Sequence, residues 1–321
     1  MVLFSLFQQR LLFLLLTFIS LSSLVHAWAQ LSPWSNHNRL WPNGKISICF
    51  QSAATERKFK PLLNAAMGLW YAAGLPESFK LHPTSEVICK NGIYDVLTVH
   101  DTPSMFVTNV GMPPEVPNPG EKLEPYAMYL STPSGWGEAL IIGSIAHELG
   151  HAFGLIHEHQ DPALWRVTDQ GPWIFEFHCR NLADFEEKTK GKTEAEIWGP
   201  EGLCVNSKTA ARAGFSALNF LPYPRDIIGP RELWPHIDDV DWDSIMLYSS
   251  TTGGTLNKGP VLTTYDGKVW KANTVPSAGD VAGLVEMYNS PFANNWEPFW
   301  LDPRSPHFEL FQQYSSCGVK D

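Results

Sequence analysis

Apolar residues recur along the chain at two different spacings, and these spacings predict its main elements. In "TERKFKPLLNAAMGLWYAAGLP" (55–76) they recur every three or four positions, which predicts an amphipathic helix. A buried helix is predicted over 137–154. A third is predicted over 278–289, where Ser277 suits the N-cap and Asp280 follows three residues later. The pattern thus predicts long helices in both halves of the chain.

Alternating apolar and polar residues predict strands between these helices. The stretch "WPNGKISICF" (41–50) offers a Pro-Asn-Gly turn followed by a strand, and strands are also predicted over 94–100 and 126–131. A loop rich in Pro and Gly (112–120) separates the last two. Further along, the charged stretch 182–198 is expected to be a helical insertion with one solvated face.

The N-terminus carries a different pattern. After Arg10 comes the apolar run "LLFLLLTFISLSSL", followed by small residues at Ala27 and Ala29. A charge, a short hydrophobic run and a small-residue cleavage site predict a secretory signal peptide over 1–29. The alternative is an uncleaved membrane anchor, for which the run is short. We therefore expect a chain that acts outside the cytosol.

Composition and charge narrow the class of partner. Hydrophobic residues make up 44% of the chain and charged residues 17%, which is typical of a globular protein. The formal net charge is −10 and no basic run stands out, which argues against nucleic acid as a partner. Once the signal peptide is removed, no stable membrane insertion is expected.

Five cysteines would face an oxidising environment in a secreted chain. Because connectivity cannot be read from sequence, we choose the nearest neighbours along the chain: Cys49 with Cys89, and Cys179 with Cys204. Cys317 is then left over, since the number is odd. No Asn-x-Ser/Thr sequon occurs, so N-glycosylation is not expected.

The stretch "IAHELGHAFGLIHEHQ" places histidines and glutamates in an apolar segment, where charged groups are costly to bury unless something binds them. His147 and His151 are four residues apart, so on a helix their rings lie on one face and can reach one Zn²⁺. Gly154 permits the turn that ends the helix, and His157 can then return as a third ligand. Glu148 lies beside the first ligand, where it can reach a water on the metal.

Three protein ligands with an open position are the arrangement of a catalytic zinc. The alternative is a structural zinc, which usually closes with a fourth Cys or His, and none lies adjacent. Glu148 would serve as general base and acid. His159 continues the run, but we expect it to be exposed or to lie behind the ligands.

The residues of this stretch resemble the metzincin clan of zinc endopeptidases, whose elongated zinc motif is followed by a turn that contains methionine. Here "SIMLY" supplies the turn, with Met246 in it. Within the clan the chain is similar to the astacins. Glu158 directly follows the third histidine, and Tyr248 lies two residues after Met246. "WPNGKISI" and "PSAGDVAGLVEMY" also look like the start and the closing helix of astacin domains.

The resemblance implies an α+β metzincin fold. Its parts are a twisted mixed β-sheet, an active-site helix above the cleft, and a smaller irregular C-terminal subdomain with the Met-turn and the C-terminal helix. We expect a signal peptide over 1–29, an astacin-like catalytic domain over 30–290 and a tail over 291–321. Residues 126–131 are our candidate for the antiparallel edge strand that would bind substrate by strand addition.

The resemblance also implies a function, that of a secreted zinc metalloendopeptidase with Zn²⁺ as its cofactor and an extended protein or peptide as its substrate. His147, His151 and His157 hold the zinc, and Glu148 acts as general base on a zinc-activated water. Tyr248 helps to stabilise the oxyanion. Two alternatives stay open. One is a catalytically silent secreted binding protein or effector on the same fold, and the other is a protease of another metzincin family.

Two features depart from the astacin pattern. The interval between His157 and Met246 is longer than is usual for astacins, so an insertion is expected within 160–240. In astacins the residue that matches Glu158 is bonded through water to the trimmed N-terminus. Its partner in this chain is left open.

Overall fold

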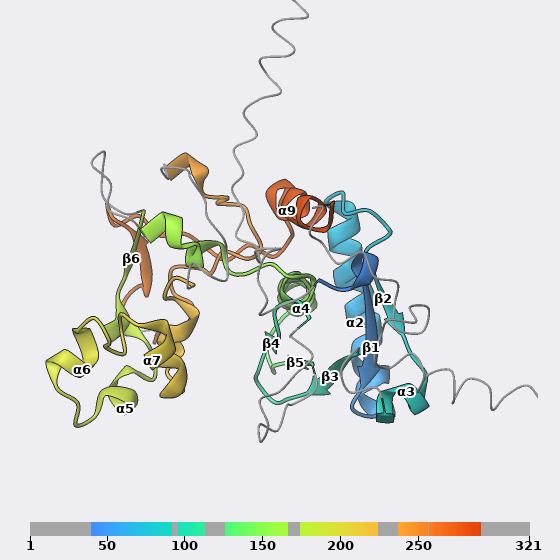
Figure 1. Cartoon of the computed structure of the whole chain (residues 1–321), viewed down its shortest axis with the longest axis horizontal. Coiled ribbons are helices and arrows are strands. Elements are labelled where there is room, and N and C mark those ends of the chain that lie inside the picture. The colour runs from blue at the N-terminus through green and yellow to red at the C-terminus, as the bar shows by residue number, and fades with distance from the viewer. Residues whose placement is uncertain are drawn as a thin grey trace, which may run out of the picture.

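A computed structural model of the chain describes residues 40–91, 96–112, 126–165, 174–223, 237–255 and 257–289. The predicted signal peptide, the tail 291–321 and Cys317 lie outside these residues, as does most of the Pro- and Gly-rich loop. The described residues form two bodies, and helix α4 (Glu138–Phe153) lies on the side of the first body that faces the second, as Figure 1 shows. We call them the N-terminal region (40–153) and the C-terminal region (174–264).

The N-terminal region contains a mixed five-stranded sheet in the order β2-β1-β3-β5-β4. β1 pairs with β2 and β3 in parallel, and β3 pairs with β5 in parallel, while β4 is antiparallel to β5. The strands are β1 (Lys45–Phe50), β2 (Lys80–Pro83), β3 (Leu97–Asp101), β4 (Val107–Thr108) and β5 (Ala127–Leu130). This mixed sheet with its helices confirms the α+β class.

The prediction that 126–131 forms the antiparallel edge strand is wrong. The strand there is β5, which lies one position in from the edge and runs parallel to β3. The antiparallel edge strand is β4, whose two residues are Val107, half exposed, and Thr108, buried. A two-residue strand is too short for alternation to reveal it.

Helices α2 (Ala53–Ala72) and α4 pack closely against each other in the N-terminal core. Ser52 caps α2 by accepting a hydrogen bond from the Thr55 N–H. Two buried tryptophans tie α4 down, since the indole N–H of Trp70 donates to the Ala146 carbonyl and that of Trp41 to the Ala152 carbonyl. The helix of the histidine motif is thereby fixed to a large core.

Helix α9 (Ala278–Asn289) begins where the sequence predicts it. Ser277 Oγ accepts from the Asp280 N–H, and the Asp280 carboxylate accepts from the Ser277 N–H, which is a reciprocal cap. The buried side chains of Val281, Leu284 and Met287 join the core of the N-terminal region. The last described helix therefore returns to the first region, as Figure 1 shows at α2 and α9.

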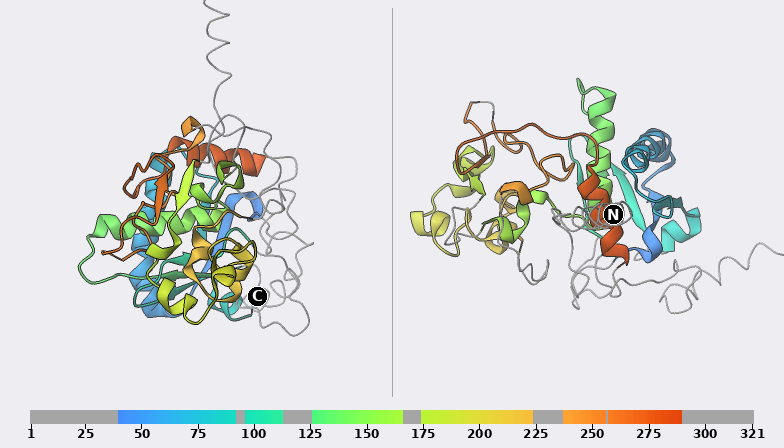
Figure 2. Two further views of the ribbon diagram at one scale, coloured as in Figure 1. Left: turned by 90° about the vertical axis from the view of Figure 1, so that its left-hand side faces the viewer. Right: turned by 90° about the horizontal axis from the view of Figure 1, so that it is seen from above.

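The C-terminal region is built differently, from short elements. The predicted helical stretch 182–198 is divided in two near Gly191, which has a positive φ of 75°. Among the described residues the region's elements are β6 (Phe175–Phe177), α5 (Phe185–Thr189), α6 (Glu194–Trp198), α7 (Ser207–Arg212), β7 (Leu262–Thr264) and the single turns Cys179–Asn181, Ser216–Asn219 and Ile237–Asp239. The right-hand view in Figure 2 shows these short pieces as one body.

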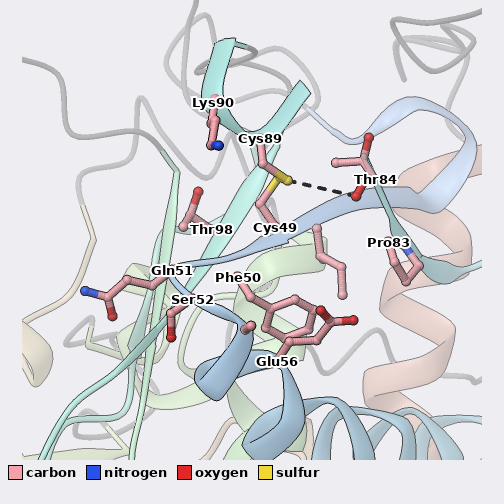
Figure 3. A pocket seen from close by; sticks show the side chains of 12 residues that line it. Cys49, Phe50, Gln51, Ser52, Glu56, Pro83, Thr84, Cys89, Lys90 and Thr98 are labelled. Atoms are coloured by element: carbon pink, nitrogen blue, oxygen red, sulfur yellow. Dashed lines mark hydrogen bonds between the residues drawn. A yellow bond between two sulfur atoms is a disulfide. The ribbon is translucent and has the colours of Figure 1, made fainter. Parts of the chain in front are cut away.

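Each region contains one disulfide. The bonds join Cys49 to Cys89 and Cys179 to Cys204, which confirms both predicted pairs. Figure 3 shows the first of them at the wall of an open hollow of about 530 Å³ near the start of α2. In the described residues, no helix has both the length and the apolar character needed to cross a membrane.

Candidate metal centre

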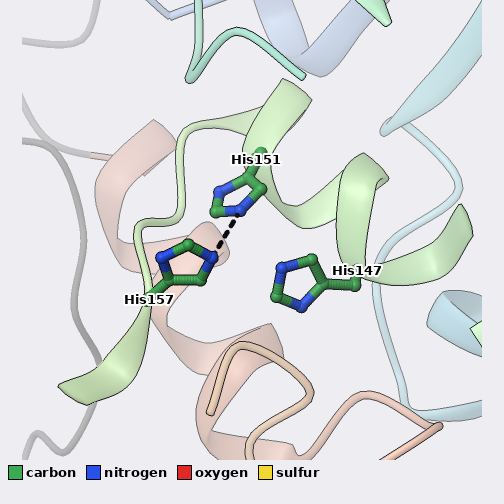
Figure 4. Close-up of side chains that lie close together, drawn as sticks. All are labelled: His147, His151 and His157. Carbon is green, nitrogen blue, oxygen red and sulfur yellow. Dashed lines mark hydrogen bonds between the residues drawn. The ribbon is translucent and has the colours of Figure 1, made fainter. Parts of the chain in front are cut away.

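Three histidine side chains converge between the two regions. His147 and His151 lie one turn apart on α4, which ends at Gly154 with a left-handed φ of 113°. A side chain at that position would be strained, which explains the glycine. The chain then turns back and brings in His157. One ring nitrogen from each histidine lies within 4.8 Å of the others, and Figure 4 shows the three rings facing one another.

The hydrogen bonds of the three rings determine their tautomers. In each ring Nδ1 faces an oxygen that only accepts, a backbone carbonyl for His147 and His151 and the amide oxygen of Gln160 for His157. Each Nδ1 must therefore carry the proton, which leaves Nε2 with a free lone pair. The acceptors are the Ile245 carbonyl at 2.8 Å for His147, the Leu155 carbonyl at 2.8 Å for His151 and Gln160 Oε1 at 2.6 Å for His157.

This arrangement fits a metal ion. Nε2 of His151 and Nε2 of His157 are 3.1 Å apart, and neither carries a proton for the other when both Nδ1 atoms donate. Burial lowers the pKa of His147 and of His157, and lowers that of His151 to about 3, so the rings stay neutral. Neutral imidazoles with converging lone pairs are the donor set that zinc prefers.

Glu148 lies beside the first of these histidines and is buried, with 3% of its surface exposed. Its Oε2 makes no hydrogen bond to any described residue. Burial raises the pKa of Glu148 to about 8, against an opposing effect of the Thr108 hydroxyl. An unpaired buried carboxylate is costly, so its place beside the histidine cluster calls for a partner that the cluster would hold.

Tyr248 packs against the same cluster from the C-terminal side. Its ring centroid is 4.0 Å from that of His157 and 5.8 Å from that of His147. Burial raises the pKa of Tyr248, and the charge of Glu148 raises it further, so the phenol keeps its proton at neutral pH. The site thus holds a protonated hydroxyl group near the carboxyl of Glu148.

Met246 lies directly beneath α4, as the resemblance implies. A Cβ placed on Gly150 would come within 2.5 Å of Met246 Sδ, so only glycine allows this close approach. The Met246 carbonyl accepts from the Glu158 N–H, and its buried side chain belongs to the N-terminal core. The turn is therefore packed against the helix before His157 and hydrogen-bonded to the residue after it.

Asp280 is a supporting residue whose sequence pattern indicates only a helix cap. It is buried, and its carboxylate accepts from Ser244 Oγ at 2.6 Å and from the Ile245 N–H at 2.9 Å. Ile245 in turn supplies the carbonyl that orients His147. Burial raises the pKa of Asp280 to about 6. The cap of α9 thereby also fixes the turn under the histidines.

Residues 158–161, which follow His157, are all buried. Oε1 of Glu158 accepts from the Asp241 N–H at 3.2 Å. His159 lies behind the ligands, with its Nε2 facing the Asn219 carbonyl at 2.9 Å, and it is not exposed. Gln160, which bonds His157, is a residue for which the sequence gives no signal.

Comparison with protein-family models gives no match, and comparison with curated protein sequences gives none either. Solved structures with a similar course include high choriolytic enzyme 1, a hatching enzyme zinc-protease from the medaka fish Oryzias latipes. It has 16% sequence identity and a TM-score of 0.48, over 81% of this chain and 98% of that one. Myroilysin has 18% identity and a TM-score of 0.44, over 78% of this chain and 95% of its own.

Proposed function

We propose that this chain is a secreted, zinc-dependent metalloendopeptidase that hydrolyses internal peptide bonds. The observation that carries the proposal is the convergence of three unprotonated Nε2 atoms beside a buried glutamate, one oxygen of which makes no hydrogen bond to the described residues. The two disulfides and the predicted signal peptide support secretion. Met246 and Glu158 have supporting roles in this proposal, because they join the turn beneath α4 to the chain around the third ligand.

His147, His151 and His157 would hold the zinc through Nε2. When bound, zinc supplies a Lewis acid and lowers the pKa of water at its open position to about 7. Glu148 takes up the proton that the attacking water loses and delivers it to the leaving amine. A carboxyl in a desolvated site suits this exchange, since its pKa lies nearer neutrality than that of an exposed glutamate.

Tyr248 is the proposed hydrogen-bond donor to the oxyanion. Its raised pKa keeps the phenol protonated, so it can donate to a carbonyl oxygen that gains negative charge. The ring contacts with His157 and His159 hold it beside the cluster.

An extended peptide is the proposed form of the substrate. β4 is the antiparallel edge strand of the sheet, and one side of it pairs with no strand in the part of the chain described. Just beyond β4, the Gly111 N–H donates to the His151 carbonyl at 2.8 Å, so the edge runs along the helix that bears the ligands. Strand addition at β4 would lay a peptide beside the metal centre.

The test is cleavage of casein by the purified secreted chain, with and without a chelator. The wild type should cleave it and lose activity when chelated, and zinc should restore activity. Glu148→Ala should keep zinc and the fold but lose cleavage. A wild type that binds zinc yet cleaves nothing would contradict the proposal and favour a silent binding protein. Full activity in Glu148→Ala would refute the role of the glutamate.

A further inference from the structure

The side chain of Gln160 connects His157 to the C-terminal region. It is buried, with 3% of its surface exposed. Its Oε1 is 2.6 Å from His157 Nδ1, while its Nε2 lies 3.0 Å from the Leu218 carbonyl and 2.8 Å from the Leu221 carbonyl. One amide thus spans the ligand and a turn about sixty residues further along the chain.

The orientation of this amide is determined by its surroundings. Carbonyl oxygens only accept, so the NH₂ group must face Leu218 and Leu221. Its oxygen then faces His157, whose Nδ1 must donate. Both N–H groups and the oxygen of Gln160 are therefore in use, and His157 Nε2 is left to point at the cluster.

The three ligands differ in what orients them. His147 and His151 donate to backbone carbonyls of Ile245 and Leu155, which a substitution does not remove. His157 alone donates to a side chain, and it lies beyond the end of α4, outside any regular helix. Its ring position therefore depends on Gln160 more than the other two depend on any single side chain.

Further hydrogen bonds join the same two segments. The Tyr223 N–H donates to the Gln160 carbonyl at 2.9 Å, and Nε2 of His159 faces the Asn219 carbonyl at 2.9 Å. The turn at 218–221 is thereby held against the residues that follow His157. It belongs to the part of the chain that departs from the astacin pattern.

We propose that Gln160 is a positioning residue for His157, and that the 218–221 turn contributes to the metal centre through it. The inference rests on the proposed function, because it assumes that His157 binds zinc. Hydrogen-bond partners of this kind typically change metal affinity by about 10–100-fold. On this view the long interval before Met246 includes a segment that the metal site requires.

The test compares Gln160→Met with Asn181→Leu in the full chain. Asn181 is a matched control, because its amide donates to the Pro260 carbonyl at 2.6 Å within the C-terminal region, away from the histidines. Zinc affinity is measured by competition with a chromophoric chelator, and the site geometry by the visible absorption of the Co²⁺ form. Circular dichroism and thermal unfolding of the metal-free proteins report the fold.

Gln160→Met should weaken zinc binding by about 10–100-fold and change the Co²⁺ spectrum. Asn181→Leu should lower the Tm but leave zinc affinity within about threefold of wild type. Equal zinc affinity in Gln160→Met and wild type would overturn the inference while leaving the proposed function intact. A wild type that binds no zinc would refute the proposed function itself. If Gln160→Met does not fold, Gln160→Asn replaces it with the same thresholds, since its shorter amide cannot span both partners.

Discussion

The two regions hold their parts of the metal centre by different means. On the N-terminal side, His147, Glu148 and His151 sit on a sixteen-residue helix that two tryptophans fasten to a large apolar core. On the C-terminal side, His157 and Tyr248 sit in irregular chain. Their places depend on individual hydrogen bonds and ring contacts. Helix geometry fixes the positions of the three residues on α4. Individual hydrogen bonds and ring contacts fix the positions of His157 and Tyr248.

Because of this difference, the residues of the metal site depend to different degrees on single side chains elsewhere in the protein. On the helix, a ligand's place follows from spacing and survives most changes elsewhere in the core. In the irregular segment, each group depends on a few named contacts, so single substitutions should move it. Substitutions and pH changes that act on one side of the metal centre therefore test this contrast.

Tyr248→Phe should lower kcat by about 10²-fold while KM changes little, because loss of one oxyanion donor typically costs about 10²–10³ in rate. The phenylalanine keeps the ring against His157, so the fold and zinc content should persist. Steady-state kinetics on a fluorogenic peptide measures kcat and KM separately. An unchanged kcat would show that the tyrosine only packs against the ligands.

The same difference between the two regions explains which parts of the fold and site can be predicted from the sequence. α2, α4 and α9 all follow from apolar spacing, and the start of α9 follows also from its cap, Ser277 with Asp280. The i, i+4 spacing of His147 and His151 needs only a helix. His157 and Met246 come from a motif rather than from periodicity. The motif gives residue types but not the partners that orient them.

The features that the sequence does not predict share one physical cause. Gln160 contacts backbone carbonyls about sixty residues away, and no local pattern encodes such a contact. The two-residue β4 is recognised only by its pairing with β5, so local alternation places the edge strand at the wrong residues. The charge pattern over 182–198 predicts a single helix, but Gly191, with its positive φ, divides this stretch in two. Short elements held by tertiary contacts leave little trace in local spacing.

Removing the Cys179–Cys204 disulfide by a double Cys→Ala substitution should lower the unfolding free energy by about 3 kcal/mol. The loop it closes holds α5 and α6, which are too short to be stable alone. Hydrogen exchange should show the loss mainly in the C-terminal region, together with weaker zinc binding. The matched variant lacks Cys49–Cys89 and should lose stability in the N-terminal region at unchanged zinc affinity. If loss of Cys49–Cys89 weakened zinc binding and loss of Cys179–Cys204 did not, the proposed difference between the two regions would be wrong.

Gly150→Ala should destabilise the protein by about 1–3 kcal/mol, because the new methyl group meets Met246 Sδ and the Trp70 ring. The control is Gly68→Ala on α2, where the added Cβ has nothing within 4 Å. It should be neutral or stabilise by up to about 1 kcal/mol. Thermal unfolding of both variants measures the difference. Equal effects would mean that Met246 is not held against α4.

The last prediction concerns pH, through the release of about one proton for each zinc bound. The lowered pKa values of the three histidines mean that protons compete with metal only well below their usual range. Glu148 behaves oppositely. Its pKa is about 8 without metal, and a dication beside it favours the charged form, so binding releases its proton.

Zinc affinity should therefore fall by about tenfold per pH unit between pH 7.5 and 5.5, rather than the roughly thousandfold that three ordinary histidines would add below pH 6.5. In Glu148→Gln this dependence should nearly vanish, because the remaining groups stay neutral across the range. Chelator competition at several pH values measures both slopes. A steep slope that persists in Glu148→Gln would mean that the histidines titrate normally. Burial of α4 in the core would then not lower the pKa values of His147 and His151.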